Sequence, residues 1–455
     1  MEMILELLRD VLSQPALLIG IMSCVGLIAL KRPFHKIMTG TLKPILGYLM
    51  LAAGAGVIVS NLDPLGKMIE HGFHITGVVP NNEAIVAVAQ KVLGVETMSI
   101  LVVGLLMNLL IARFTKFKYV FLTGHHSLFM ACLMSAVLGT AGLSGIELIL
   151  VGGFLMGAWS AISPAIGQSY TSKVTDGDEI ALGHFGSLGY YLSAWVAKYV
   201  GKAEESTEDI EIPEKWGFLR DSTLSTALTM IVFYLIAAIA AGSEFVATLS
   251  GSMSPYLFAV MSAMNFAVGV AIVYSGVRMI LGDLIPAFQG IATKIIPNAI
   301  PAVDCAVFFT YAPTAVVLGF ISSFIGGIIG MLILGAVGGV LIIPGLVPHF
   351  FCGATAGIYG NATGGRRGAA VGAFLNGLAI TFLPALALPV LGQLGFQNTT
   401  FGDADFAVMG LVLGNAFEWI GMAGIYGVVV IAALVLIIPN FIKTKGKVIN
   451  YVEEE

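Results

Sequence analysis

The sequence has 455 residues, of which 57% are hydrophobic and 11% are charged, whereas about 25% of the residues in an ordinary soluble protein are charged. With a mean hydropathy of +0.94, this composition excludes a soluble globular protein and leaves no room for a separate soluble domain. The formal net charge of −5 carries little information when most residues lie in lipid. We therefore predict an all-α polytopic membrane protein with spans of about 20 residues each.

Apolar runs in the first half predict five spans and two irregular segments. Residues 63–95 contain too many polar groups for a clean span, so we expect an amphipathic helix and then a buried hairpin around residues 80–90. Residues 181–197 are rich in glycine, which favours a re-entrant segment because irregular backbone at membrane depth must be shielded by protein. The spans are expected at about 15–30, 44–62, 96–112, 119–140 and 143–166.

Residues 201–222 include the only long charged stretch in the sequence, and we interpret them as a cytoplasmic linker. The second half repeats the pattern, with a hairpin near residues 301–311. Its spans are expected at about 223–242, 255–281, 313–338, 340–360, 368–392 and 419–440. The predicted architecture is about 11 transmembrane helices in four parts: residues 1–200 as a first repeat, the linker, residues 223–418 as a second repeat, and residues 419–455 as a last span and tail.

The two halves carry matching motifs at a nearly constant offset. Pro80 to Ala84 is echoed by Pro301 to Cys305, so that Glu83 and Asp304 are 304 − 83 = 221 residues apart. Gly56 and Gly276 are 220 apart, and more loosely Gly177-Asp178 is answered by Gly402-Asp403 at 225. A constant offset indicates duplication, and many transporters consist of two repeats whose carboxylates and broken helices meet at one site.

Basic residues set the orientation of the repeats. The positive-inside bias places all five basic clusters in the cytoplasm, together with the C-terminus. When the spans are followed from one cluster to the next, each copy has an odd number of full crossings. The second repeat therefore starts on the opposite side of the membrane and is inverted relative to the first. The clusters are Lys31 to Lys43, Arg113 to Lys118, Lys198 to Arg220, Arg366 with Arg367, and Lys443 to Lys447.

Two carboxylates and two histidines are candidate binding groups, because ionisable side chains inside a membrane are costly and usually have a partner or a purpose. Glu83 and Asp304 head the two hairpins, and the alternative is that each only caps its own helix. His125 and His184 both follow a glycine, and neutral imidazole both donates and accepts hydrogen bonds, as polyol recognition requires. Structural histidine is their alternative, while His126 is expected to face away.

The sequence offers little for metal binding, nucleotide hydrolysis or disulfide formation. We found no pair of histidines or acids at i, i+4 on one predicted face, and His71, His74 and Glu70 fit a solvated face better. The sequence contains no P-loop. The four cysteines are isolated and are expected to be reduced. A membrane enzyme is disfavoured because no nucleophile-base pair is recognisable.

With these motifs in view, the chain resembles the IIC subunit of the ascorbate-type branch of the bacterial sugar phosphotransferase system over nearly its full length. The motifs are Leu122-Thr123-Gly124-His125, Val174-Thr175-Asp176-Gly177 running into Gly183-His184, Gly201-Lys202 with the acidic residues up to Asp209, Val303-Asp304-Cys305-Ala306, and Pro344-Gly345 followed by Pro348 and Phe350-Phe351.

The resemblance implies a homodimer in which each protomer has a dimer-forming domain and a mobile core domain that carries the substrate by an elevator-like movement. It also implies that His125, His184 and Asp304 bind the substrate, that a separate cytoplasmic IIB protein phosphorylates it, and that IIA is a further partner. The chain itself would then be a transport subunit of the bacterial inner membrane rather than an enzyme.

The sequence departs from the ascorbate transporters where the substrate would be recognised. Their two glutamines fall on Phe129 and Phe185 here, and their Thr-Tyr pair falls on Asn82 and Glu83. The resemblance implies ascorbate or a related small sugar or polyol as the substrate, but two carboxylates and phenylalanine favour a neutral sugar or polyol over an anion such as ascorbate. The alternative is an ion-coupled secondary transporter in which Glu83 or Asp304 titrates.

Overall fold

The computed structural model describes residues 11, 14–74, 77, 78, 80, 82–177, 179–210, 222–392 and 400–441. For Pro15 and residues 83–94, among others, only the backbone is described. The described chain is mostly helical, as the composition predicts. Large apolar side chains such as Ile239, Ile431 and Phe441 are exposed on the outer helices, which suits a surface that faces lipid.

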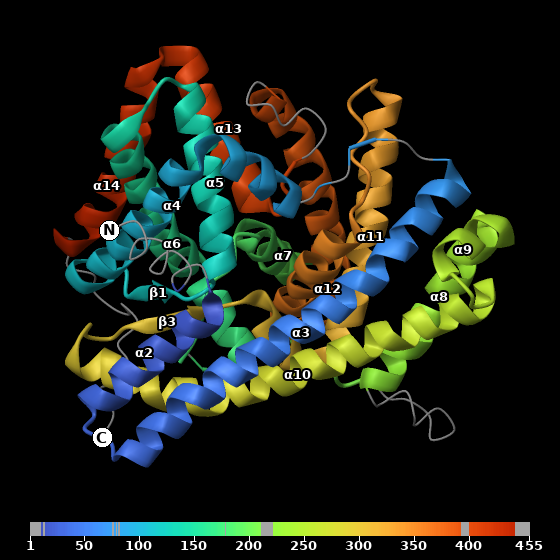
Figure 1. The fold of residues 1–455 in the computed structure, drawn as a ribbon, viewed down its shortest axis with the longest axis horizontal. Helices are drawn as coiled ribbons and strands as arrows, with labels where there is room; N and C mark the ends of the chain where they lie inside the picture. The colour runs from blue at the N-terminus through green and yellow to red at the C-terminus, as the bar shows by residue number, and fades with distance from the viewer. Residues whose placement is uncertain are drawn as a thin grey trace.

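Two helices of 40 residues each lie side by side and form the centre of one layer of the protein. The helix α3 (Phe34–Phe73) packs along α10 (Pro255–Lys294), and α2 (Pro15–Ala29) and α8 (Ser222–Ala241) lie beside them (Figure 1). The close approach depends on glycine, because a Cβ on Gly276 would lie 2.6 Å from the carbonyl oxygen of Gly47. Small residues serve this purpose in membrane helices generally.

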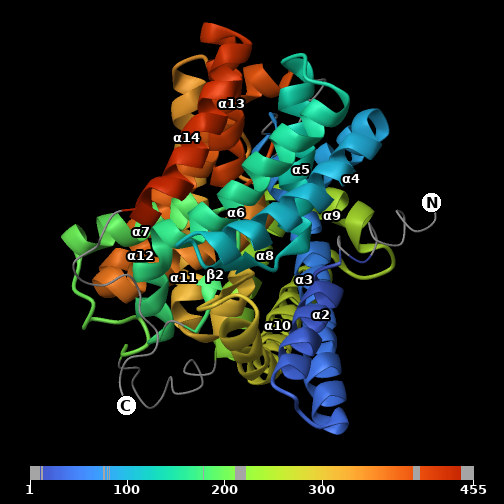
Figure 2. The same cartoon turned by 90° about the vertical axis from the view of Figure 1, so that its left-hand side faces the viewer.

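Most of the other helices form a second body, which lies above this layer in Figure 1 and above and to the left of it in Figure 2. In that body α4 packs on α6, and α11 and α7 pack on α12. The helices are α4 (Asn82–Phe114), α5 (Gly124–Thr140), α6 (Gly145–Thr175), α7 (Ser187–Val200), α11 (Pro313–Ala336), α12 (Leu346–Gly392), α13 (Ala404–Ile420) and α14 (Met422–Phe441).

A small parallel sheet lies at the boundary between the two bodies (Figure 1), and the all-α prediction missed it. The strand β3 (Ile300–Val303) pairs with β1 (Tyr119–Phe121) on one side and β2 (Ala181–Leu182) on the other. Strands of two to four residues carry too little sequence pattern to be recognised. They form because each finds hydrogen-bonding partners more than 100 residues away along the chain.

Several predicted segment boundaries were wrong. The hairpin expected around residues 80–90 is instead the start of α4, which continues as one helix to Phe114. The helix α13 was not predicted. The spans expected at 340–360 and 368–392 are halves of α12, which is broken at Gly364 and Gly365, where Gly365 has φ +60°. The segment near 301–311 is β3 followed by a short 3-10 helix, η2 (Cys305–Thr310).

The number of membrane spans depends on how broken helices are counted. Among the described residues, seven helices are long and apolar enough to cross a membrane, or eight if α8 and the short α9 (Ser243–Ser250), bent by 117°, form one broken span. This criterion counts α12 once, and α2, α5 and α13 are shorter than its 18-residue minimum. The number of 11 spans therefore stays a prediction.

The first half of the predicted linker, residues 201–210, forms hydrogen bonds with the helical part of the protein. Residues 211–221 lie outside the described residues. Glu208 accepts hydrogen bonds from the backbone N–H groups of Thr314 and Ala315, at the N-terminus of α11. The Arg366 N–H donates to the carbonyl oxygen of Glu205. The carboxylate of Glu208 satisfies amide groups that no helical partner can reach, and it lies at the positive end of the helix dipole.

Candidate functional site

The parallel sheet brings three distant segments to one place. Because its strands run in the same direction, their carboxyl ends lie at one edge, and each strand is followed there by a candidate residue. His125 and His126 open α5 after β1, His184 follows β2, and Asp304 follows β3. Backbone hydrogen bonds from Leu122 to Ala302 and from Gly183 to Val303 continue the pairing to this edge.

Asp304 both caps a helix and faces a histidine. Its Oδ1 accepts a hydrogen bond of 3.0 Å from the Ala306 N–H at the start of η2, so the capping interpretation is correct for that oxygen. Its Oδ2 lies 3.5 Å from Nε2 of His125. The other ring nitrogen of His125 lies 3.2 Å from the hydroxyl of Tyr48 on α3, so this pair also links the two bodies.

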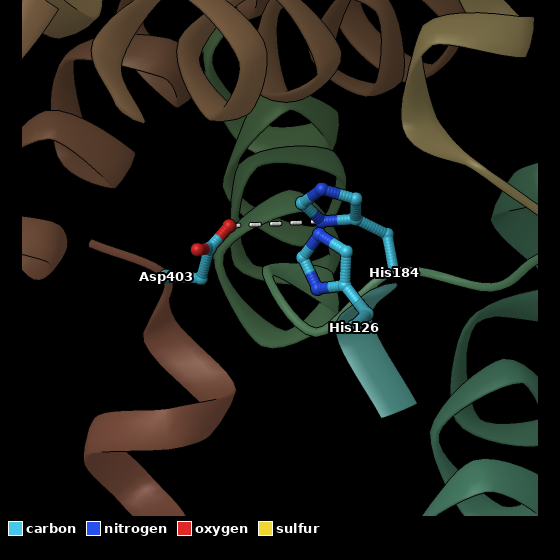
Figure 3. Close-up of side chains that lie close together, drawn as sticks. All are labelled: His126, His184 and Asp403. Atoms are coloured by element: carbon cyan, nitrogen blue, oxygen red, sulfur yellow. Dashed lines mark ion pairs between the residues drawn. The ribbon is translucent and has the colours of Figure 1, made fainter. Parts of the chain in front are cut away.

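A second carboxylate-histidine pair lies beside the first. Oδ1 of Asp403 is 3.8 Å from Nδ1 of His184, and the ring of His126 lies 3.8 Å, centroid to centroid, from that of His184 (Figure 3). The expectation that His126 faces away was wrong, because the first turn of α5 directs it toward His184. The side chains form one series of contacts: Asp304, His125, His126, His184 and Asp403.

Backbone amides fix the tautomers of the two buried histidines. The Gly186 N–H donates to Nδ1 of His184 at 3.1 Å, and the Phe185 N–H donates to Nδ1 of His126 at 3.4 Å. An imidazole nitrogen that accepts a hydrogen bond carries no proton, so we assign the proton of each ring to Nε2. Both rings are neutral in this arrangement, and the contact between His184 and Asp403 is not a charged ion pair.

Asp403 is held by two neutral donors. The side-chain amide of Asn82 donates to Oδ2 at 2.6 Å, and the thiol of Cys352 donates to Oδ1 at 3.0 Å. The Asn82 carbonyl in turn accepts the Gly402 N–H at 2.9 Å. The sequence analysis did not select Asp403 or Cys352. The available signal for Asp403 was the Gly-Asp motif repeated between the halves.

A cavity of about 1240 Å³ contains these groups. Polar side chains of the series line it together with aromatic and apolar ones, the usual composition of a small-molecule site. The lining includes Tyr48, Asn82, His125, His126, Phe129, His184, Asp304, Cys305, Phe351, Cys352 and Asp403.

One predicted site residue, Phe185, is placed differently, and the prediction for Glu83 is not tested. Phe185 does not line the cavity, because its side chain is fully buried and stacks on Phe121 with ring centroids 4.6 Å apart. The side chain of Glu83 lies outside the described residues, although its backbone belongs to the first turn of α4. His349, expected to be structural, is buried and forms a hydrogen bond with Ser323 instead of lining the cavity.

The grouping of His126, His184 and Asp403 could in principle hold a metal ion, since one ligand atom from each lies within 4.8 Å of the others. The Nδ1 atom of His184, however, already accepts the Gly186 N–H and lies 2.9 Å from the hydroxyl of Tyr190. A metal would have to displace these bonds. The arrangement is therefore better suited to hydrogen bonding than to coordination.

Comparison with known proteins identifies the family of this chain. The chain is 26% identical over 416 residues to the ascorbate-specific PTS system EIIC component of Mycoplasma pneumoniae, an alignment that covers 78% of this chain. The chain spans 62% of the length of that relative. The family model described as the PTS system sugar-specific permease component matches residues 10–405. Because this match covers nearly the whole chain, the protein belongs to the family of sugar-specific permease components of the phosphotransferase system.

Proposed function

We propose that this protein is the IIC membrane subunit of a phosphoenolpyruvate-dependent sugar phosphotransferase system, in which it binds a small sugar-like substrate. The substrate is translocated and then phosphorylated by a cytoplasmic IIB protein, which receives its phosphoryl group from IIA. The observation that carries the proposal is that Asp304, His125, His184 and Asp403 line one cavity. Hydrogen-bonding groups beside Phe129 suit a polyhydroxylated ligand with one apolar face.

The packing of the two 40-residue helices α3 and α10 supports the proposal of two inverted repeats, residues 1–200 and 223–418. The backbone at Gly47 approaches that at Gly276, and Gly54 approaches Gly269. With an offset of 222 residues between the repeats, Gly47 corresponds to Gly269 (269 − 47 = 222) and Gly54 corresponds to Gly276 (276 − 54 = 222). The contact between Gly47 and Gly276 therefore becomes the contact between Gly269 and Gly54 when the repeats are exchanged. A contact that maps onto itself when the repeats are exchanged is what a two-fold axis between antiparallel helices produces.

The cavity lies between two walls that could move relative to each other. Leu51, Ala55 and Leu62 on α3 form one wall, whereas His184 and Asp304 belong to the sheet-bearing body opposite. We propose that this body is the mobile core domain and carries the substrate in an elevator-like movement past the α3 layer. The resemblance to the ascorbate-type family also implies a homodimer.

The residues at the ends of the cavity favour an outward-facing state. Its lining reaches Gln14, just before α2, and Lys67 and Phe73 near the end of α3. Both places lie at the ends of these helices opposite the basic cluster of Lys31 to Lys43, which the positive-inside bias assigns to the cytoplasm. The C-terminus is assigned to the cytoplasm on the same basis.

The substrate is proposed to be ascorbate or a related small sugar or polyol. The relative from Mycoplasma pneumoniae is named as ascorbate-specific. This chain has Phe129 in its cavity where the ascorbate-type pattern has an amide, and the carboxylates of Asp304 and Asp403 would disfavour an anionic ligand.

Uptake by membrane vesicles tests the function directly. If the proposal is correct, accumulation of a labelled substrate requires phosphoenolpyruvate together with the soluble phosphotransferase proteins, and the product inside is phosphorylated. An ion-coupled secondary transporter would instead accumulate unmodified substrate with a proton or sodium gradient alone. Vesicles that carry Asp304→Asn serve as the control for uptake through this cavity.

A further inference from the structure

Asp403 has spare hydrogen-bonding capacity on the cavity side. An ionised carboxylate has about four acceptor positions, and the described contacts use one on each oxygen, for the donors Asn82 and Cys352. Both of these partners are neutral, and both are donors. Hydrogen bonds donated to both oxygens stabilise a carboxylate.

The neighbouring histidine does not neutralise this charge. Nδ1 of His184 accepts the Gly186 N–H, so the nitrogen that lies 3.8 Å from Asp403 carries no proton. Asp403 is only 5% exposed, yet it lines the cavity. The site therefore keeps a buried negative charge whose free acceptor positions have no cation among the groups described around them.

The two carboxylates occupy different ends of the series of histidine rings. Asp304 contacts His125 and Asp403 contacts His184, with His126 between these rings. Asp304 comes from the loop after β3, whereas Asp403 precedes α13 and is tied by Asn82 to the start of α4. A ligand that reaches both carboxylates must present hydroxyl donors at two separated positions.

We propose that Asp403 is a second substrate-binding carboxylate, which accepts hydrogen bonds from hydroxyl groups of an uncharged sugar or polyol and disfavours anionic ligands. This inference rests on the proposed function and adds a specificity-determining residue to the site. Hydroxyl groups satisfy the free acceptor positions without a proton transfer, whereas a carboxylate or enolate would bring a further negative charge close to the carboxylates of Asp304 and Asp403.

Binding measured by isothermal titration calorimetry on the full chain in detergent tests this inference. The probes are xylitol, sorbitol, D-xylose and L-ascorbate, each titrated into the wild type and Asp403→Asn. We expect at least one uncharged probe to bind the wild type and to lose about tenfold or more in affinity in Asp403→Asn, the cost of losing a charged acceptor. L-ascorbate should bind the variant as well as the wild type or better.

Two further variants keep the result interpretable. Asp283→Asn makes the same chemical change at a carboxylate that pairs with Lys43 and does not line the cavity, so its affinities should match the wild type. If Asp403→Asn does not yield folded protein, Asp403→Ser replaces it, because a serine hydroxyl is small and can still accept a hydrogen bond.

Three outcomes would overturn the inference. In the first, uncharged probes bind Asp403→Asn as tightly as the wild type; phosphoenolpyruvate-dependent uptake would then still support the proposed function. In the second, L-ascorbate alone binds and is weakened by the substitution. In the third, the wild type binds Zn²⁺ stoichiometrically and the variant does not, which would make Asp403 a metal ligand. Absence of binding by all four probes, together with absence of phosphoenolpyruvate-dependent uptake, would refute the proposed function as well.

Discussion

The carboxylate of Asp405 is predicted to be a major stabilising group behind the site. It is fully buried at the start of α13 and accepts three hydrogen bonds. The donors are the Leu188 N–H at 2.9 Å, the Ser187 hydroxyl at 2.7 Å and the indole N–H of Trp159 at 3.1 Å. One side chain thus connects α13 with α6 and with the first turn of α7, which follows His184 closely in the chain.

Replacing Asp405 with alanine removes the acceptor of all three donors. Each hydrogen bond to a charged group contributes about 1.5–3 kcal/mol, but bonds that share one acceptor are not additive. The serine hydroxyl can also rotate toward another partner. We therefore expect Asp405→Ala to lower the free energy of unfolding by about 3–5 kcal/mol, and Asp405→Asn by less, because the amide oxygen keeps one or two of the bonds.

Equilibrium unfolding in mixed micelles, with the melting temperature in detergent as a second measure, would provide these values. Asp209→Ala is the control, because Asp209 is exposed and surface substitutions usually change stability by less than about 0.5 kcal/mol. A loss below about 1 kcal/mol for Asp405→Ala, or equal losses for alanine and asparagine, would show that the three donors have other partners and that the reasoning fails.

Three further predictions concern Asp304, the glycine contact and the linker. Asp304→Asn should leave the melting temperature nearly unchanged, since asparagine caps helices as well as aspartate, but should lower ligand affinity about tenfold or more; normal binding would leave only the capping role. Gly276→Ala should lower the free energy of unfolding in micelles by about 1–3 kcal/mol, whereas Gly56→Ala should not, because a Cβ at Gly56 would meet open space. Equal effects of the two substitutions would argue against close packing at Gly276. Glu208→Ala should lower the free energy of unfolding by about 0.5–2 kcal/mol, and Glu204→Ala should lower it less. Indistinguishable melting temperatures of the two variants would exclude the contact between Glu208 and the N-terminus of α11.

The sequence predicted the general class of protein and selected several residues that line the cavity. Hydropathy is a local property, so helical segments near those expected for α2, α8 and α14 could be located from apolar runs alone. His125, His184 and Asp304 could be selected because a polar side chain after a glycine or proline stands out in an apolar chain. All three do line one cavity.

The boundaries that were wrong depended on information that is not local. Residues 80–90 were expected to form a hairpin because residues 63–95 contain too many polar groups for a clean span. Instead, α4 begins at Asn82, whose side chain forms hydrogen bonds with Gly402 and Asp403 some 320 residues later. The helix α13 was missed because its polar first turn is buried by contacts with distant segments, among them α6 and α7. Tertiary partners override local propensity in both places.

The sequence alone determined that the chain spans a membrane, that its halves carry related motifs, and that a few ionisable groups stand in apolar surroundings. Only the tertiary structure decided which of these groups meet. The parallel order β1-β3-β2 brings His125, His184 and Asp304 to one edge, the first turn of α5 directs His126 inward, and Asn82 holds Asp403 in place. Composition and periodicity describe one segment at a time, whereas a binding site depends on hydrogen bonds between segments that the chain connects only through hundreds of intervening residues.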